Sequence, residues 1–214
     1  MIIGIDASRA NREHKSGVEW YSYYLIKRLA QIDKHNQYIL YSDKPLRNGM
    51  ADLTRPDEQE TFVPIQFDQK GFQVIRSPFN NFKAKILNWP FTHFWTQGRL
   101  SIEMLLHRPD VLFIPASALP IIHPRNCVVT VHDIGFERNN YLYNKERMGP
   151  ESKFARKFIN FAVRIATRGQ YSAHTVDYLK WSTAHIVKHA KKIIAVSNFT
   201  KHELMDVYGC PEKK

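Results

Sequence analysis

The chain has 214 residues, of which 43% are hydrophobic and 24% are charged, and its formal net charge is +11. This composition is that of a globular protein, and no apolar run reaches the roughly 20 residues that a membrane-spanning helix needs. The N-terminus lacks the basic stretch and apolar core of a signal peptide. The two cysteines form neither a disulfide framework nor a metal-ligand spacing, so we expect a reduced, cytoplasmic protein.

Positive charge is concentrated in one segment. Between residues 145 and 192 there are eleven lysines and arginines against three acidic residues. Such a segment is typical of a solvated helical face, of contact with an anionic membrane surface, or of an anionic ligand. No helix-turn-helix, zinc-finger or aromatic ribonucleoprotein motif is present, so no nucleic-acid partner is expected.

The first thirty residues predict a strand, a polar loop with Arg9 in it, and a capped helix. Residues 2–6 are an apolar strand, and Ser16 followed by Glu19 is a capping box that starts the helix. The helix N-terminus offers free N–H groups to a phosphate, and Gly17 lets a ligand approach the backbone. The helix presents one apolar face of Val18, Tyr21, Leu25, Leu29 and Ile32. There is no G-x-G-x-x-G or Walker loop, so neither a nicotinamide nor an ATP fingerprint is found.

Strands and helices alternate along the rest of the chain. Further strands are predicted at residues 37–42, 61–67, 110–114, 127–133 and 192–196, and helical blocks at residues 79–106 and 151–190. Ser197 is a good N-cap for a last helix that stops at Gly209. This alternation predicts one α/β domain with a parallel sheet flanked by helices.

The strand at residues 127–133 is the strongest indication of chemistry. Its nearly continuous β-branched run is typical of a strand buried on both faces, and it ends in His132 and Asp133. Ligands bind at the carboxyl ends of strands in open parallel sheets. A structural histidine followed by a turn-forming aspartate is the alternative interpretation.

Three segments, taken together in order and spacing, resemble the N-terminal domain of family-4 retaining glycosyltransferases, which have the GT-B fold. They are residues 4–6 with 16–21, residues 129–133 (Val-Thr-Val-His-Asp), and residues 192–201 ahead of 208–213. The resemblance covers nearly the whole chain, although residues 67–108 match no motif of the family.

The resemblance implies two Rossmann-like domains that face each other across a cleft. The N-terminal domain binds mainly the acceptor, and the C-terminal domain binds mainly the nucleotide-sugar donor. We therefore expect residues 1–214 to form a single N-terminal Rossmann-like domain, with the donor-binding domain absent from this chain and the fragment inactive alone. The implied activity is a hexosyl transfer with retention to a glycan or lipid-linked acceptor, as in cell-envelope polysaccharide synthesis. No metal or other cofactor is expected beside the nucleotide-sugar.

The resemblance also assigns roles to individual residues. Gly17 would lie near the diphosphate and sugar of the donor, and His132 would hydrogen-bond the transferred sugar or an acceptor hydroxyl. Asp133 would orient His132 or close the turn. Arg9 would meet an anionic group. Ser197 would line the floor of the cleft or merely cap its helix.

Two other classes of function stay open from the sequence. One is a non-catalytic basic module that binds an anion or a membrane surface through residues 145–192, and the other is a different enzyme on the same fold, such as a nucleotide-sugar epimerase. A basic face with exposed aromatic residues gains roughly 1 kcal/mol per basic residue at an anionic membrane. Peripheral membrane association on the cytoplasmic face is therefore a further expectation for the glycosyltransferase itself.

Overall fold

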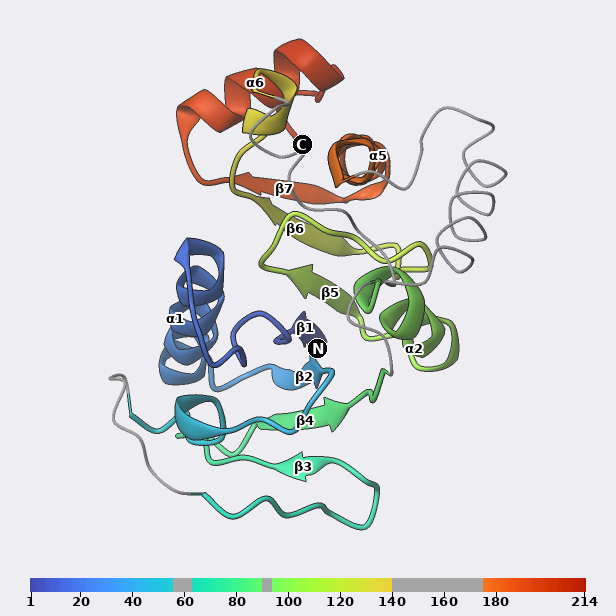
Figure 1. The fold of residues 1–214 in the computed structure, drawn as a ribbon. Coiled ribbons are helices and arrows are strands. Elements are labelled where there is room, and N and C mark those ends of the chain that lie inside the picture. The colour runs from blue at the N-terminus through green and yellow to red at the C-terminus, as the bar shows by residue number, and fades with distance from the viewer. Residues whose placement is uncertain (56–62, 90–93, 140–174) are drawn as a thin grey trace, which may run out of the picture. The chain divides into compact units, whose positions relative to one another are not determined.

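The computed structural model describes residues 1–55, 63–89, 94–139 and 175–214 (Figure 1). The chain divides into two compact units, Met1–Thr130 and Val131–Lys214, and each is described by itself. The elements of the first unit are β1 (Ile2–Asp6), α1 (Gly17–Ile32), β2 (Gln37–Ser42), η1 (Asn48–Met50), β3 (Gln73–Val74), β4 (Phe82–Ile86), η2 (Thr96–Leu100), α2 (Ser101–Leu106), β5 (Val111–Ile114) and β6 (Cys127–Val131), which ends one residue past the boundary. Among the described residues, no helix is long and apolar enough to cross a membrane.

The strands form a mixed, mostly parallel sheet in the order β3-β4-β2-β1-β5-β6-β7, in which β7 is Lys192–Ala195. The pairs β1–β2, β1–β5, β2–β4 and β5–β6 are parallel, whereas the short β3 runs antiparallel to β4. This α/β Rossmann-like architecture confirms the predicted fold class. The antiparallel edge strand was not predicted.

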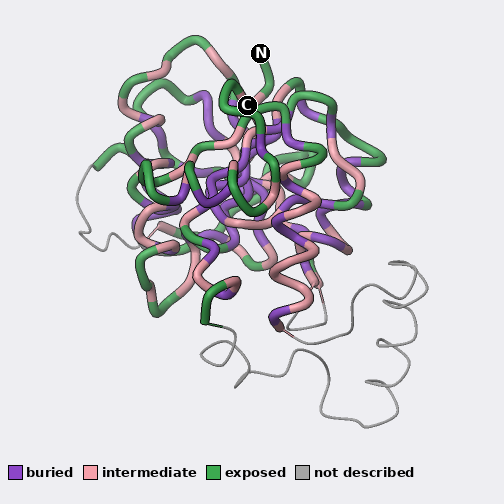
Figure 2. The backbone as a smooth tube through the Cα atoms, turned by 90° about the horizontal axis from the view of Figure 1, so that it is seen from above, coloured by how far each residue is buried: buried purple, intermediate pink, exposed green. Residues whose placement is uncertain are grey.

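The core of the first unit lies between the sheet and α1. Figure 1 shows α1 and α2 on opposite sides of the strands of this unit. Ile5, Leu40 and Ala84 are paired across neighbouring strands, so they lie on the same face of the sheet, and they form one buried cluster with Ile26 of α1. Figure 2 shows the resulting succession of buried and exposed stretches along the backbone.

The predicted apolar face of α1 was partly wrong. Ile32 is 61% exposed, and the buried positions of the helix are Glu19, Ser22, Tyr23, Ile26, Lys27 and Ala30. Polar residues can occupy this face because their groups find partners. The Ser22 hydroxyl donates to the carbonyl of Val18 at 2.8 Å, and the Lys27 ammonium donates to the carbonyl of Arg55 at 2.8 Å.

The predicted helical block at residues 79–106 was wrong over most of its described part. It contains β4, then the π-helix η2, and a true α-helix only at α2. Phe82 and Ala84 are buried and alternate with the half-buried Lys83 and Lys85, which is a strand pattern. Phe82 stacks on Tyr38 of β2 with ring centroids 4.2 Å apart, and Lys85 pairs with the buried Glu103 at 2.5 Å. These contacts favour the strand over the helix.

The strand predicted at residues 61–67 was also not found in its described part. Residues 63–67 form no strand, apart from one isolated bridge between Phe67 and Gln73. Ile65 and Phe67 are 40% and 52% exposed. Residues 61 and 62 lie outside the described part of the chain.

The second unit contains α5 (Thr175–His189), β7 (Lys192–Ala195) and α6 (Asn198–Tyr208), preceded by the short η3 (Gly135–Glu137). The predicted strand and final helix are confirmed. Gly209 has φ +62°, the left-handed conformation that ends a helix and that favours glycine. Of the basic helical block predicted at residues 151–190, the described part from Thr175 is helical to His189, and residues 151–174 lie outside the described part.

Candidate functional site

The candidate residues lie in two turns, and the first of these is the loop between β1 and α1. Asp6 ends this strand with only 3% exposure, and its Oδ1 accepts hydrogen bonds from the hydroxyl and the N–H of Ser8 at 2.6 and 3.0 Å. Burial raises the pKa of the Asp6 carboxyl, and the hydrogen bonds from Ser8 oppose part of that shift. Asp6 therefore holds the start of the loop that leads to α1.

The end of this loop is fixed by the predicted capping box. Glu19 accepts hydrogen bonds from the N–H of Ser16 at 3.2 Å and from the Ser16 hydroxyl, and Arg9 donates to Glu19 Oε1 at 3.2 Å. Burial opposes the charged form of Glu19, but these hydrogen bonds and the nearby Arg9 lower the pKa of its carboxyl overall. The guanidinium of Arg9 thus pairs with the carboxylate that caps α1.

Gly17 lies in open space at the first position of α1. A Cβ built at this residue would meet nothing within 4 Å, and Gly17 is exposed. The helix behind it supplies backbone N–H groups without intrahelical partners and the positive end of a dipole. An anionic ligand can therefore approach this end of the helix closely.

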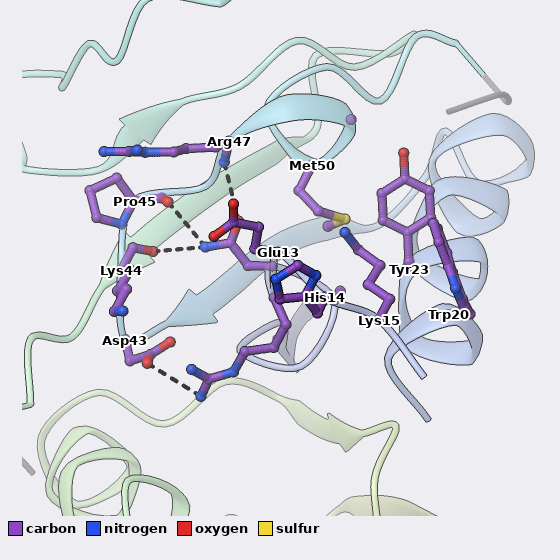
Figure 3. A pocket seen from close by; sticks show the side chains of 14 residues that line it. Glu13, His14, Lys15, Trp20, Tyr23, Asp43, Lys44, Pro45, Arg47 and Met50 are labelled. Atoms are coloured by element: carbon purple, nitrogen blue, oxygen red, sulfur yellow. Dashed lines mark hydrogen bonds and ion pairs between the residues drawn. The ribbon is translucent and has the colours of Figure 1, made fainter. Parts of the chain in front are cut away.

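A pocket of about 890 Å³ lies within the first unit, where the chain leaves β1 and β2 (Figure 3). It is lined by residues 10–15, by Trp20 and Tyr23 of α1, and by Asp43, Lys44, Pro45, Arg47, Gly49 and Met50. Figure 3 shows Lys15 beside the two aromatic rings on one side and Lys44, Pro45 and Arg47 on the other. Neither Arg9 nor Gly17 is among the lining residues.

Sequence reasoning missed the basic residues of this pocket. Lys44 and Arg47 follow β2 as Arg9 and Arg12 follow β1, and the carboxyl ends of neighbouring parallel strands share one edge of a sheet. That order along the chain was the signal that could have identified them. The sequence analysis assigned no role to the segment after β2.

In the second unit, His132 follows directly after β6 and is linked to the start of α6. The hydroxyl of Thr200 donates to the carbonyl of His132 at 3.1 Å. The N–H of Thr200 donates to the hydroxyl of Ser197 at 3.0 Å, which is the N-cap contact of this helix. The structure therefore connects His132 and Ser197 through Thr200.

Asp133 makes a turn contact beside them. Its Oδ1 accepts a hydrogen bond from the N–H of Gly135 at 2.9 Å, the geometry that closes an Asx turn. Ser197 also lines a second pocket, of about 530 Å³, between β7, α6 and the last residues of the chain. Arg9 and Gly17 belong to the first unit and His132, Asp133 and Ser197 to the second, so each group is placed only within its own unit.

The described residues hold no group of three or more His, Cys, Asp or Glu side chains that is placed to bind a metal ion. A search among curated proteins finds no match to the chain. The family model described as Glycosyltransferase Family 4 matches residues 15–214. This span includes the N-termini of α1 and α6 and the turn at His132 and Asp133. It confirms the resemblance drawn from the three segments. The chain therefore belongs to glycosyltransferase family 4, as the N-terminal half of a GT-B fold.

Proposed function

We propose that this chain is the acceptor-binding half of a retaining glycosyltransferase that moves a hexose from a nucleotide-sugar to a glycan or lipid-linked acceptor. The observation that carries the proposal is the family match over residues 15–214. Donor binding is assigned to a second domain, so the chain alone is expected to transfer no sugar. Synthesis of cell-envelope polysaccharide in the cytoplasm is the setting that suits such acceptors.

The chemistry asks the protein mainly to stabilise negative charge. When the sugar is transferred, the bond to the nucleoside diphosphate breaks and charge develops on the leaving phosphate. Backbone N–H groups and basic side chains aimed at that charge lower the barrier, because they need not reorganise during the reaction. The open N-terminus of α1 at Gly17 suits this task. Arg9, which pairs with Glu19 at 3.2 Å, would add positive charge near that end.

His132 would hydrogen-bond the transferred sugar or the acceptor hydroxyl. Its backbone is held by the hydroxyl of Thr200, and the turn after it is closed by Asp133. A fixed backbone at His132 fixes the point from which its side chain extends, which favours an oriented contact. In this proposal Ser197 supports the site through its helix cap and does not touch the sugar.

The test is sugar transfer by the product of the complete reading frame, with the substitution His132→Ala. We expect kcat to fall by about a hundredfold, as for the loss of one donor aimed at developing charge. His35→Ala is the matched control, because His35 is an exposed histidine in the loop between α1 and β2. Transfer that stays at the wild-type rate in a folded His132→Ala protein would remove His132 from the proposed site.

A second candidate, a non-catalytic module on an anionic membrane surface, is favoured by one feature of α2. Ile102, Leu105 and Leu106 of this helix are 48%, 57% and 64% exposed, and the exposed Arg108 follows. An apolar surface beside basic residues is typical of contact with anionic lipid. The same surface could hold the glycosyltransferase against the cytoplasmic face of the membrane.

Sedimentation with lipid vesicles, together with a transfer assay, distinguishes the membrane-binding module from the glycosyltransferase. Binding to anionic but not neutral vesicles, weakened by Leu105→Gln with Leu106→Gln, is expected from membrane contact. Equal sedimentation with both kinds of vesicle would exclude it. If binding is found but the complete protein transfers no sugar from any nucleotide-sugar, the binding module replaces the transferase as the leading function.

A further inference from the structure

We propose that the 890 Å³ pocket of the first unit binds a phosphate group of the acceptor, so that the enzyme glycosylates a phosphorylated rather than a neutral glycan. This inference rests on the proposed function, because it names the class of acceptor for the same half of the enzyme. Three observations support it. They are the charge of the pocket, the hydrogen bonds that hold the backbone of its basic wall, Lys44 and Arg47, and the position of the pocket in the first unit.

The pocket is lined by more basic than acidic residues. Four of its lining residues are lysine or arginine, namely Arg12, Lys15, Lys44 and Arg47, against the two acidic residues Glu13 and Asp43. Arg12 pairs with Asp43 at 3.4 Å. Within the described residues, no hydrogen bond or ion pair is found for the ammonium of Lys44 or the guanidinium of Arg47. Two such cations among the lining residues of one pocket suit a phosphate.

The backbone that carries these two cations is held in place. Asn11 Nδ2 donates to the carbonyls of Lys44 and Pro45 at 3.3 and 3.0 Å, and Asn11 Oδ1 accepts from the N–H of Arg47 at 3.2 Å (Figure 3). Beside them, the buried side-chain amide of Gln73 makes two hydrogen bonds of 2.8 Å with the backbone of Leu46. Preorganisation of this kind is what a binding wall requires, because little order must be created when the ligand arrives.

The opposite wall suits the sugar part of such a ligand. The ammonium of Lys15 lies 5.2 Å from the ring centroids of both Trp20 and Tyr23. Gly49 packs so closely on Tyr23 that a Cβ there would lie 1.8 Å from the tyrosine hydroxyl, so the absence of a side chain at Gly49 lets Tyr23 take this position. Aromatic and cationic walls across a cavity of this size match a phosphorylated sugar better than a simple ion.

The position of the pocket assigns the phosphate to the acceptor. Gly17, which is proposed to face the donor diphosphate, does not line it. The pocket is lined by the loop after β1, the first half of α1 and the segment after β2. A phosphate on a soluble sugar and a phosphate on a lipid-linked acceptor share this chemistry.

The experiment is calorimetric titration of the whole chain with glucose 6-phosphate, with glucose, and with vesicles that contain phosphatidylinositol. We expect glucose 6-phosphate or the vesicles to bind and glucose not to bind, the first result indicating a soluble and the second a lipid-borne phosphate. Lys44→Gln with Arg47→Gln should weaken that binding at least tenfold, since each removes a charge-assisted contact. The matched control is Arg28→Gln with Lys34→Gln, which removes the same charge from exposed residues of α1 and the loop after it.

Two results would overturn the inference. One is equal loss of binding in the control variant, or no binding of either phosphate probe, which would leave only the general positive charge of the chain. The other is displacement of the phosphate probe by UDP with equal sensitivity to Lys44 and Arg47, which would assign the pocket to the donor. Failure of the complete protein to transfer sugar would contradict the proposed function, whereas these binding results stand apart from transfer.

Discussion

The turn after β1 and the turn after β6 hold their backbones by different means. After β1, two carboxylates hold the loop, because Asp6 accepts a hydrogen bond from Ser8 and Glu19 accepts hydrogen bonds from Ser16 and Arg9. After β6, two hydroxyl groups and one carboxylate hold the chain, because Thr200 donates to the carbonyl of His132, Ser197 caps α6, and Asp133 accepts from the N–H of Gly135. The first turn is thus held mainly through carboxylates, and the second mainly through the hydroxyl groups of the α6 N-terminus.

This difference separates residues that hold each turn from residues that face a ligand. In the first turn the charged side chains are engaged, and what faces outward is the backbone at Gly17. In the second turn the carbonyl of His132 accepts a hydrogen bond from Thr200, and the imidazole is the group proposed to meet the sugar. A ligand would thus contact the main chain at the turn after β1 and a side chain at the turn after β6.

Gly17→Ala gives the sharpest test of this contrast. The added Cβ meets nothing within 4 Å, and alanine has a better helix propensity than glycine, so unfolding free energy should stay constant or rise by about 0.5–1 kcal/mol. If a ligand approaches this backbone, transfer should fall about tenfold or more, the effect of about 1.4 kcal/mol. Melting temperature and kcat/KM of the complete protein, measured together, decide it. Unchanged transfer would mean that Gly17 only starts the helix.

Ser197→Ala should show the opposite pattern. It removes the oxygen that accepts the N–H of Thr200, and the loss of such a cap costs about 1 kcal/mol of stability. Transfer per folded molecule should change by less than twofold, because Ser197 supports the turn without touching the sugar. Denaturant unfolding and a transfer assay at low temperature check both parts. A large loss of kcat with normal stability would instead place Ser197 in the cleft floor.

The sequence predicted the elements that bear local signals. The Ser16–Glu19 box, the β-branched run before His132, and Gly209 after α6 are each decided by neighbouring residues, and the structure has all three. These features carried the family resemblance as well. They place the residues that end each strand, which is why the candidate positions could be named before the fold was known.

The sequence did not predict what depends on distant partners. β4 is set by the stacking of Phe82 on Tyr38 and by its register with β2, so its lysines and aromatics alone suggested a helix. The basic wall at Lys44 and Arg47 depends on Asn11, more than thirty residues earlier. Such contacts become visible only when the strands lie side by side.

The smallest predicted effect concerns pH, and it separates the two carboxylates of the first turn. The pKa of Glu19 is lowered below 4.5 in the fold, so its contribution is present above that pH and is lost as the pH falls through the folded value. The pKa of Asp6 is raised above 3.8, so its ionisation disfavours the fold and stability declines as the pH rises through that shifted value. Glu19→Gln should therefore lower the free energy of unfolding more at pH 7 than at pH 3.5. Asp6→Asn keeps an oxygen that can accept from Ser8, and it should lower the free energy of unfolding less at pH 7 than at pH 3.5. The differences are about 1 kcal/mol or smaller, and denaturant unfolding at the two pH values measures them. Parallel pH profiles for both variants would show that the two carboxylates hold this turn in the same way.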